Sequence, residues 1–281
     1  MMNHDTQFCI VGLGLLGGSY AQGLKQKGFK VSAVDINENS IEYALKMKWI
    51  DEGSTSLECL KKADCVILGL YPTLVVDWIK ENQCLIKSNA IITDVTGIKR
   101  EIVPAIQSIL RSDLEFIASH PMAGREVSGV EFSTPSIFKP ANFIITPTES
   151  NTDRAIEFVT ELAQLLEFRR VTTLTIQEHD EMVAFLSQLT HVIAVSLMNT
   201  NDNTHLVEYT GDSFRDLTRI AKINENLWSE LFIMNKDMLL KEIDDFSKEL
   251  QNFRDTLEKE DVERMKQLFI QSTMRRKQFD K

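Results

Sequence analysis

An apolar run that passes directly into a glycine-rich loop is the feature that most limits how this chain can fold. Phe8-Cys9-Ile10-Val11 is followed by Gly12-Leu13-Gly14-Leu15-Leu16-Gly17, and a stretch compatible with a helix comes next. In a strand–loop–helix unit the first glycine permits a tight turn, the second lets backbone approach a diphosphate, and the third lets helix and strand pack closely. The helix N-terminus adds unpaired N–H groups and the positive end of its dipole. We therefore expect a dinucleotide-binding loop with contacts from Gly12, Gly14, Leu15, Leu16 and Gly17.

An acidic residue downstream of the loop indicates which dinucleotide binds. Asp35 follows the apolar run 31–34, at the place where an acidic residue hydrogen-bonds the ribose hydroxyl groups of NAD in units of this kind. A carboxylate there repels a 2′-phosphate, and no arginine follows it directly in Asp35-Ile-Asn-Glu-Asn. The sequence therefore predicts NAD as the cofactor in preference to NADP.

The chain divides into two halves with different patterns. All six prolines lie at or before Pro147, and eleven of the twelve glycines lie at or before Gly129. In the first half, short apolar runs typical of buried strands alternate with stretches of helical spacing, which predicts a parallel sheet covered on both faces. The expected strands are 8–11, 31–34, 65–70, 91–93, 116–118, 142–146 and 169–172, and the expected helices are 19–26, 38–48, 99–110 and 152–166. We expect an NAD-binding domain of residues 1–172.

The second half, residues 173–281, contains no proline and only one glycine, Gly211. Apolar residues recur every three or four positions from Met182 to Leu197, which predicts one stripe along a long helix. Further helices are expected at 226–257 and from 261 to the end. Because an all-helical half this apolar often completes its burial against a second copy, we expect a homodimer.

Composition limits the classes of partner and compartment. A formal net charge of -10 argues against broad binding to nucleic acids or anionic membranes, which requires a basic face. No apolar run is expected to reach the roughly 20 residues that cross a bilayer, and no N-terminal stretch resembles a signal peptide. The four cysteines (Cys9, Cys59, Cys65 and Cys84) form no C-x-x-C pair and are expected to be reduced. We expect a cytoplasmic protein with no nucleic-acid partner, no membrane partner and no metal site.

Two further expected strands lead into polar residues. Residues 91–93 lead to Asp94-Val-Thr-Gly-Ile-Lys99, and residues 116–118 lead to Ser119-His120-Pro-Met-Ala-Gly124. In an open parallel sheet, ligands lie beyond the carboxyl ends of the strands. His120 is therefore expected to face the nicotinamide, where an imidazole can accept the proton of a hydroxyl group whose carbon loses hydride.

Several ordered motifs together resemble the prephenate dehydrogenases and the related arogenate dehydrogenases. They are 12–18, 94–99, 119–124, His179-Asp180, 187–191 and 214–221, and they span nearly the whole chain. The resemblance implies an α/β Rossmann-type domain followed by an all-α dimerisation domain like the C-terminal domain of 6-phosphogluconate dehydrogenase. It also implies NAD-dependent oxidative decarboxylation of prephenate to 4-hydroxyphenylpyruvate, a step of tyrosine biosynthesis, with His120 as the catalytic histidine.

The resemblance also assigns residues in the helical half. Ser187 and His191 match substrate-binding positions, and because they are four positions apart they share one face of a helix. Arg219 matches the arginine that holds a carboxylate of prephenate, for which a guanidinium fork is well suited. Many family members have serine in Asp-x-Gly-Ser-Val-Lys, where it assists the catalytic histidine, whereas this chain has Gly97. We expect the neighbouring hydroxyl group of Thr96, or water, to take its place.

Two other residues are given no direct catalytic role. His179 is offset by about 120° from His191 around an ideal helix, so we interpret His179-Asp180 as a helix-start or domain-junction feature. Arg125, just beyond the His120 motif, can approach the substrate or a partner subunit.

Three alternative functions remain open at this point. Arogenate differs from prephenate by an amino group in its side chain. The presence of His191 and the lack of an obvious added carboxylate favour prephenate as the substrate only weakly. A hydroxyacid dehydrogenase with the same layout needs a lysine on the first long helix of the second domain, and residues 175–198 contain none. A non-catalytic NAD-binding sensor is favoured only by Gly97, and it has no need of His120 and Arg219.

Overall fold

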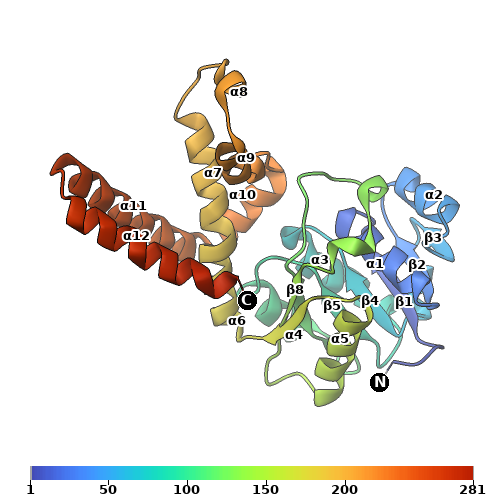
Figure 1. Cartoon of the computed structure of the whole chain (residues 1–281). Helices are drawn as coiled ribbons and strands as arrows, with labels where there is room; N and C mark the ends of the chain where they lie inside the picture. Colours follow the sequence, from blue (N-terminus) through green and yellow to red (C-terminus); the bar gives the residue numbers. More distant parts are fainter. Residues whose placement is uncertain (1, 281) are drawn as a thin grey trace. The chain divides into compact units, whose positions relative to one another are not determined.

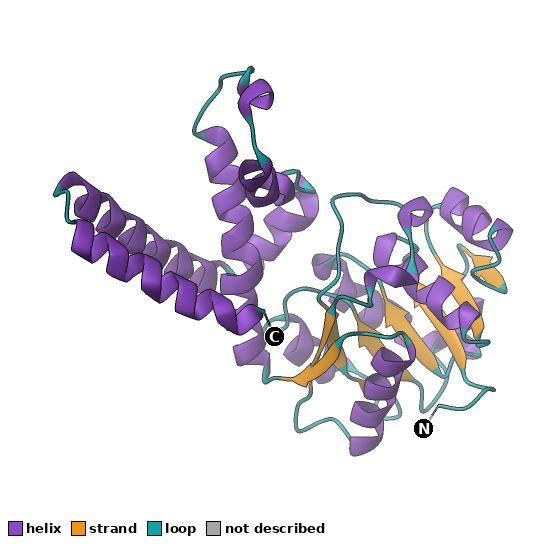
Figure 2. Cartoon of the chain, viewed as in Figure 1, coloured by secondary structure: helices purple, strands orange, loops and turns teal. Residues whose placement is uncertain are grey.

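A computed structural model describes residues 2–280. Its main sheet has six strands in the order β3-β2-β1-β4-β5-β6, and all neighbouring strands run parallel (Figures 1 and 2). The strands are β1 (Gln7–Val11), β2 (Lys30–Val34), β3 (Glu52–Ser54), β4 (Cys65–Leu68), β5 (Ile91–Asp94) and β6 (Glu115–Phe116). The chain moves outward from β1 to β3 and then returns to the other side of β1, so the carboxyl ends of β1 and β4 border the point where ligands bind in such sheets.

Helices cover both faces of this sheet. α1 (Leu15–Gln26), α2 (Glu38–Lys46) and α5 (Asp153–Leu165) belong to one core, and α3 (Pro72–Asn82) and α4 (Ile102–Ile109) belong to the other. Successive side chains of a strand point to opposite faces, so Phe8 and Ile10 of β1 enter the first core while Cys9 and Val11 enter the second. Burial on both faces explains why the strands are nearly all apolar.

A second, smaller sheet has the order β7-β8-β9. β7 (Ala118–Pro121) pairs antiparallel with β8 (Asn142–Thr146), which pairs parallel with β9 (Arg170–Thr173). The apolar run expected as one strand at 116–118 is therefore divided between two sheets. His120 lies inside β7 opposite Ile144. It therefore follows the carboxyl end of β6 by four residues, as expected, but it stands in a second strand that the sequence did not predict.

From Ile176 onward the described chain is helical. α6 (Ile176–Val183), a π-helical turn (Ala184–Gln188) and α7 (Leu189–Asn199) follow one another without a break. The remaining helices are α8 (Leu206–Tyr209), α9 (Asp212–Thr218), α10 (Glu225–Met234), α11 (Lys236–Glu258) and α12 (Val262–Arg276). The single helix predicted at 226–257 is in fact two, because Asn235 leaves helical geometry with φ -119° and ψ 26°. Its buried amide donates to the carbonyl oxygen of Asp180 and to the side chain of Gln188.

By compactness the chain divides into two units, Met1–Asn235 and Lys236–Lys281. The second unit is a hairpin of α11 and α12, in which the rings of Phe253 and Phe269 lie 6.2 Å apart. This division falls at a different place from the domain boundary expected at residue 172, which stays a prediction.

The helix Ile176–Asn199 is long and apolar enough to cross a membrane by length and composition alone, with a mean hydropathy of 1.5. The expectation that no apolar stretch reaches this length was therefore wrong. A core helix of a soluble protein passes the same test. This helix also carries three polar residues that belong to the candidate site: His179, Ser187 and His191.

Candidate active site

The glycine-rich loop between β1 and α1 is packed tightly on its protein side. Gly12 has φ +91°, a backbone conformation that favours glycine, and a Cβ there would lie 2.6 Å from the carbonyl oxygen of Gly69. A Cβ at Gly17 would lie 1.9 Å from the carbonyl oxygen of Gly12, whereas one at Gly14 would meet no atom within 4 Å. The loop is therefore closed against the protein at Gly12 and Gly17 and open at Gly14, where a diphosphate can approach.

The start of α1 and the end of β2 supply the other groups that a dinucleotide needs. α1 begins at Leu15, followed by Leu16, and no side chain caps its first N–H groups. The carboxylate of Asp35 accepts hydrogen bonds from the backbone N–H groups of Leu13 (2.5 Å) and Asn37 (2.7 Å), which hold it at the tip of the loop. Uncapped N–H groups suit a diphosphate, and a fixed carboxylate suits ribose hydroxyl groups. The start of α1 and Asp35 therefore fit a bound dinucleotide.

The side chain of His120 meets a second histidine, from α6. Nδ1 of His120 lies 2.9 Å from Nε2 of His179, with the two ring planes at 61°. On its other side, Nδ1 of His179 lies 2.7 Å from Oδ1 of Asp180. His179 and Asp180 are fully buried. The three side chains form a continuous hydrogen-bonded line from the interior of the protein to His120.

Both imidazole rings of this line are held in the neutral form. Burial lowers the pKa of His120 well below its usual value, and the neighbouring His179 and Lys99 lower it further. Burial also lowers the pKa of His179, and this outweighs the opposing effect of the Asp180 carboxylate. A neutral imidazole is the form that can accept a proton.

The interpretation of His179-Asp180 as a helix-start or domain-junction feature does not include the contact of His179 with His120. The start of α6 is capped by Thr175 and Glu178, which hydrogen-bond each other's backbone. Asp180 instead accepts from the backbone N–H groups of Lys99 (3.0 Å) and Arg100 (2.9 Å), which fastens the loop after β5 to α6. Sequence reasoning missed the pairing of His120 with His179 because the two residues are 59 positions apart, so no local spacing relates them.

A buried ion pair fixes the loop after β5 against β7. Nζ of Lys99 donates to Oδ2 of Asp94 (2.6 Å) and to the carbonyl oxygen of Ser119 (2.7 Å), and both charged side chains are fully buried. The hydroxyl group of Thr96 donates to the same Asp94 carboxylate and accepts from Lys99 (3.2 Å). Because its one proton is donated inside this network, Thr96 supports the loop and has no proton left to donate to His120.

Position 97 lies beside the Cε1 and Nε2 atoms of the His120 ring. A Cβ at Gly97 would lie 3.7 Å from Cε1 and 3.8 Å from Nε2 of His120, and 3.3 Å from Cδ2 of Leu231. A hydroxyl group at this position would thus reach Nε2. With glycine here, the residue at position 97 contributes no side chain beside that atom.

The three helical residues predicted to bind substrate lie together near two further side chains. We call this group of five the helical cluster: Ser187, His191, Arg219, Trp228 and Glu126. Ser187 lies in the π-helical turn, a distortion common at functional sites, and its carbonyl oxygen accepts from Nδ1 of His191 (2.8 Å). The ring of His191 lies 3.6 Å from that of Trp228. Arg219, just after α9, forms an ion pair with Glu126. Both charges lie close enough to affect the pKa of His191, which is lowered mainly by burial.

Helix α10 links the helical cluster to His120. Trp228, which contacts His191, and Leu231, which lies beside Gly97, are three positions apart and therefore share one face of the helix. Glu126 follows β7 by only five residues. The two groups of predicted site residues are thus neighbours, about one helical turn apart along α10.

Two family descriptions match the chain in succession. "Prephenate dehydrogenase, nucleotide-binding domain" matches residues 20–172, and "Prephenate dehydrogenase, dimerization domain" matches residues 175–271. The chain belongs to the prephenate dehydrogenase family. It is therefore an oxidoreductase by family, and the predicted fold of a Rossmann-type domain followed by a helical dimerisation domain is confirmed.

Several known proteins are similar to this chain over most of its length. The prephenate dehydrogenase of Bacillus subtilis (strain 168) is 29% identical, over 92% of this chain and 72% of that protein. The cyclohexadienyl dehydrogenase of Zymomonas mobilis subsp. mobilis is 26% identical, over 94% and 92%. The crystal structure of A. aeolicus prephenate dehydrogenase in complex with hydroxyphenyl propionate and NAD+ has a TM-score of 0.89 and 28% identity, and covers 99% of this chain and 100% of that chain.

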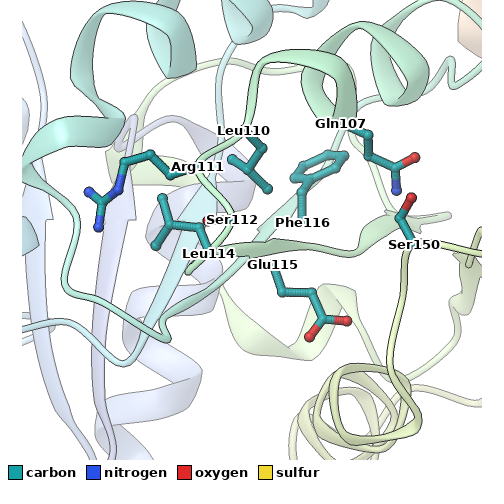
Figure 3. Close-up of a pocket in the computed structure, with 8 residues that line it drawn as sticks. All are labelled: Gln107, Leu110, Arg111, Ser112, Leu114, Glu115, Phe116 and Ser150. Carbon is teal, nitrogen blue, oxygen red and sulfur yellow. The ribbon is translucent and has the colours of Figure 1, made fainter.

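Two further features of this prephenate dehydrogenase family member are Arg125, next to Glu126 of the helical cluster, and a cavity outside the site. The side chain of Arg125 is exposed. A cavity of about 160 Å³ beside β6 is lined by Gln107, Glu115 and Ser150 among others, and Arg111 at its edge is paired with its own neighbour Asp113 (Figure 3). None of the predicted site residues lines this cavity.

Proposed function

We propose that this chain is an NAD-dependent prephenate dehydrogenase, which converts prephenate to 4-hydroxyphenylpyruvate with release of CO2. One observation carries the proposal: neutral His120 is hydrogen-bonded through Nδ1 to His179, which leaves Nε2 beside Gly97 to meet a substrate. A sensor without catalysis has no use for a buried imidazole line of this kind.

NAD would lie along the glycine-rich loop. The open side at Gly14 and the N–H groups of Leu15 and Leu16 would hold its diphosphate, and Asp35 would hold its adenosine ribose. The bound cofactor supplies the hydride acceptor of the reaction. The relative from A. aeolicus was solved with NAD+, which supports this choice.

His120 acts on the ring hydroxyl group of prephenate. Nε2 accepts the hydroxyl proton as hydride leaves the carbon that bears the oxygen. The bond to the ring carboxylate then breaks, CO2 departs, the ring becomes aromatic, and His120 returns its proton to the phenolate oxygen. Aromatisation makes the reaction strongly favourable, so the protein's task is to position the ring and to hold this one proton.

The helical cluster would bind the substrate side chain. The guanidinium of Arg219 can bind a carboxylate through two parallel hydrogen bonds, and a bound substrate would replace Glu126 as its partner. Ser187 and His191 line the same face of the helix and would contact the rest of the side chain.

Arogenate is a second candidate substrate, and Glu126 is the observation that favours it. Nδ1 of neutral His191 is turned toward the carbonyl oxygen of Ser187, so its Nε2 presents a lone pair. A carboxylate and an imidazole lone pair near Arg219 offer partners to an ammonium group as well as to a carboxylate.

Initial rates of NADH formation with each substrate test the proposal. We expect the purified protein with NAD to show a kcat/KM for prephenate at least tenfold above that for arogenate. The opposite ratio would assign the site to arogenate, and in that case Glu126→Gln should reduce the kcat/KM for arogenate much more than that for prephenate. No NADH with either substrate would overturn the proposed activity.

We also propose that the protein is a cytoplasmic homodimer. The match to a dimerisation domain supports the dimer. So do apolar side chains of α11 and α12 that are more than 50% exposed, among them Leu250, Leu257, Ile270 and Met274, because an exposed apolar surface often marks an interface. The buried thiols of Cys9 and Cys59 remain free with their sulfur atoms 3.5 Å apart, which fits a reducing compartment. Light scattering of the protein as it elutes from a size-exclusion column should give twice the mass of one chain. The mass of a single chain would contradict the dimer.

A further inference from the structure

We propose that Asp180 and His179 select the tautomer of His120 and share the proton that it takes up. They act as positioning residues, because they reach the substrate only through His120. The inference rests on the proposed function for its kinetic part, but the tautomer itself can be observed without any turnover.

The proton positions follow from the buried end of the line. Asp180 accepts hydrogen bonds from the backbone N–H groups of Lys99 (3.0 Å) and Arg100 (2.9 Å). Both oxygens of Asp180 therefore act as acceptors, as they do in a carboxylate, which has no proton to donate. Nδ1 of His179, 2.7 Å from Oδ1 of Asp180, must therefore carry a proton and donate it.

The proton on Nδ1 of His179 also determines where His120 carries its proton. A neutral His179 that is protonated on Nδ1 has a lone pair on Nε2, which can only accept. Nδ1 of His120, 2.9 Å away, must then be the donor. A neutral His120 has a single ring proton, so its Nε2 carries the lone pair that a substrate hydroxyl group needs.

The reverse assignment would make His120 useless as a base. It requires His179 to carry two protons and a positive charge at a fully buried position. The charged groups that act on this position are Asp180, Asp94 and Lys99, and burial together with Lys99 outweighs the two carboxylates in setting the pKa of His179 below its usual value. Arg100, within 3.6 Å of Asp180, further offsets the charge of that carboxylate.

Gly97 makes the line more important in this chain. A side chain at position 97 could orient His120 from the Nε2 side, since a Cβ there would lie 3.8 Å from Nε2. Glycine offers no such group, so the hydrogen bond that orients the ring is the one that His120 donates to His179. The orientation of His120 thus depends on His179, a residue to which the sequence assigned no direct catalytic role.

Proton uptake can be followed along the line. The substrate O–H bond breaks and its proton joins Nε2 of His120. While this added proton is present, the Nδ1 proton of His120 can move to Nε2 of His179, next to the Asp180 carboxylate. The positive charge on His179, which the resting protein does not hold, is therefore transient. The same protons move back when the phenolate oxygen is reprotonated, so no proton is gained or lost overall.

Nitrogen NMR of histidine-labelled protein tests the tautomer directly. The chain has five histidines, and the His120→Asn variant identifies the signals of His120. We expect a protonated Nδ1 and an unprotonated Nε2 in the protein without substrate. A protonated Nε2 on His120 would overturn the inference, whatever the enzyme's substrate proves to be.

Two matched substitutions at position 179 separate tautomer selection from packing. His179→Gln keeps an acceptor for Nδ1 of His120 and a donor for Asp180, but it cannot take up a proton. His179→Leu fills similar space without either group. We expect His120 to keep its tautomer in the Gln variant and to lose it in the Leu variant.

The kinetic readout should follow the same order. We expect kcat to fall about tenfold in His179→Gln and roughly 10²–10⁴-fold in His179→Leu, the range for a lost acid–base function. Asp180→Asn can present an N–H group to His179 and reverse the tautomers of both histidines, so its kcat should resemble that of His179→Leu. The same exchange of Asp for Asn in a Ser-His-Asp triad lowers kcat about 10⁴-fold. The dissociation constant for NAD should stay within about threefold throughout.

Asn235→Ala serves as the control for loss of structure. It removes the amide that donates to the carbonyl oxygen of Asp180 and leaves the carboxylate and both histidines intact. We expect a lower Tm with an unchanged His120 tautomer and pH profile of kcat. If His179→Leu and Asn235→Ala lower kcat equally at equal loss of Tm, or if Gln and Leu at 179 behave alike, the inference is wrong. If the wild-type protein produces no NADH from prephenate or arogenate while the NMR result holds, the proposed function fails and the tautomer assignment stands.

Discussion

Nδ1 of His120 lies 2.9 Å from Nε2 of His179, although the two residues come from β7 and α6 and belong to different predicted domains. This contact orients the imidazole that the proposed reaction uses. Because the strand and the helix must both be in place for it to form, the base is correctly oriented only in the folded protein.

Replacing His120 should stop the chemistry and leave cofactor binding unchanged. His120→Asn keeps a polar side chain of similar length but removes the proton acceptor, so we expect kcat to fall roughly 10²–10⁴-fold. The dissociation constant for NAD, measured by fluorescence titration, should stay near its wild-type value. Near-normal turnover of the variant would reject the role of His120 as base.

The pH dependence of stability should show the two buried histidines. The pKa values of His120 and His179 are lowered in the folded protein, while unfolded histidine titrates near about 6.5. Above that pH both histidines are neutral in the folded and in the unfolded protein, so they contribute nothing to the free energy of unfolding. As pH falls through about 6.5 the unfolded chain takes up protons that the folded protein does not, so the free energy of unfolding should decrease.

Denaturant titrations between about pH 8 and pH 5 check this slope. His179→Gln should flatten it, because one of the two groups no longer titrates. A slope that His179→Gln does not change would contradict the account.

Two glycines of the dinucleotide loop should respond differently to added side chains. Gly17→Ala places a Cβ 1.9 Å from the carbonyl oxygen of Gly12, so the backbone must move and Tm should fall by several degrees. Gly14→Val projects into open space, so Tm should hold while the dissociation constant for NAD rises about tenfold or more. Thermal melts and NAD titrations of both variants check the pair. Unchanged NAD binding by Gly14→Val would place the diphosphate elsewhere.

Arg219 should act on substrate binding more than on turnover. Loss of a charged hydrogen-bonded contact costs about 1.5–3 kcal/mol, so Arg219→Ala should raise KM for prephenate roughly tenfold to a hundredfold with a smaller change in kcat. Arg219→Lys should recover only part of the loss, because an ammonium cannot make the two parallel bonds of a guanidinium. An unchanged KM in the Ala variant would remove Arg219 from the site.

Local signals in the sequence were sufficient for much of the Rossmann-type domain. The apolar runs at β1 and β2 and the glycine-rich loop carry their own structural preferences, because a buried strand must be apolar and a tight turn must have glycine. β3 was missed because Glu52-Gly-Ser is a short, polar edge strand. α3 was missed as well, although Pro72 at its first turn is a position that proline favours.

The candidate site was less predictable, because long-range contacts decide the roles of its residues. Thr96 is next to Gly97 in sequence, yet Asp94 and Lys99 use its hydroxyl group. Nothing near Arg219 in the sequence indicates its pairing with Glu126. The break at Asn235 likewise comes from a buried amide that bonds to α6, a contact that no helical periodicity contains.

The stoichiometry of a single reaction mixture tests the central claim most directly. Purified protein is given NAD and a limiting amount of prephenate, and NADH, CO2 and 4-hydroxyphenylpyruvate are measured together. Oxidative decarboxylation predicts equal amounts of the three products, formed at rates that fall together in His120→Asn. NADH without matching CO2 and aromatic product, or no NADH at all, would contradict the account.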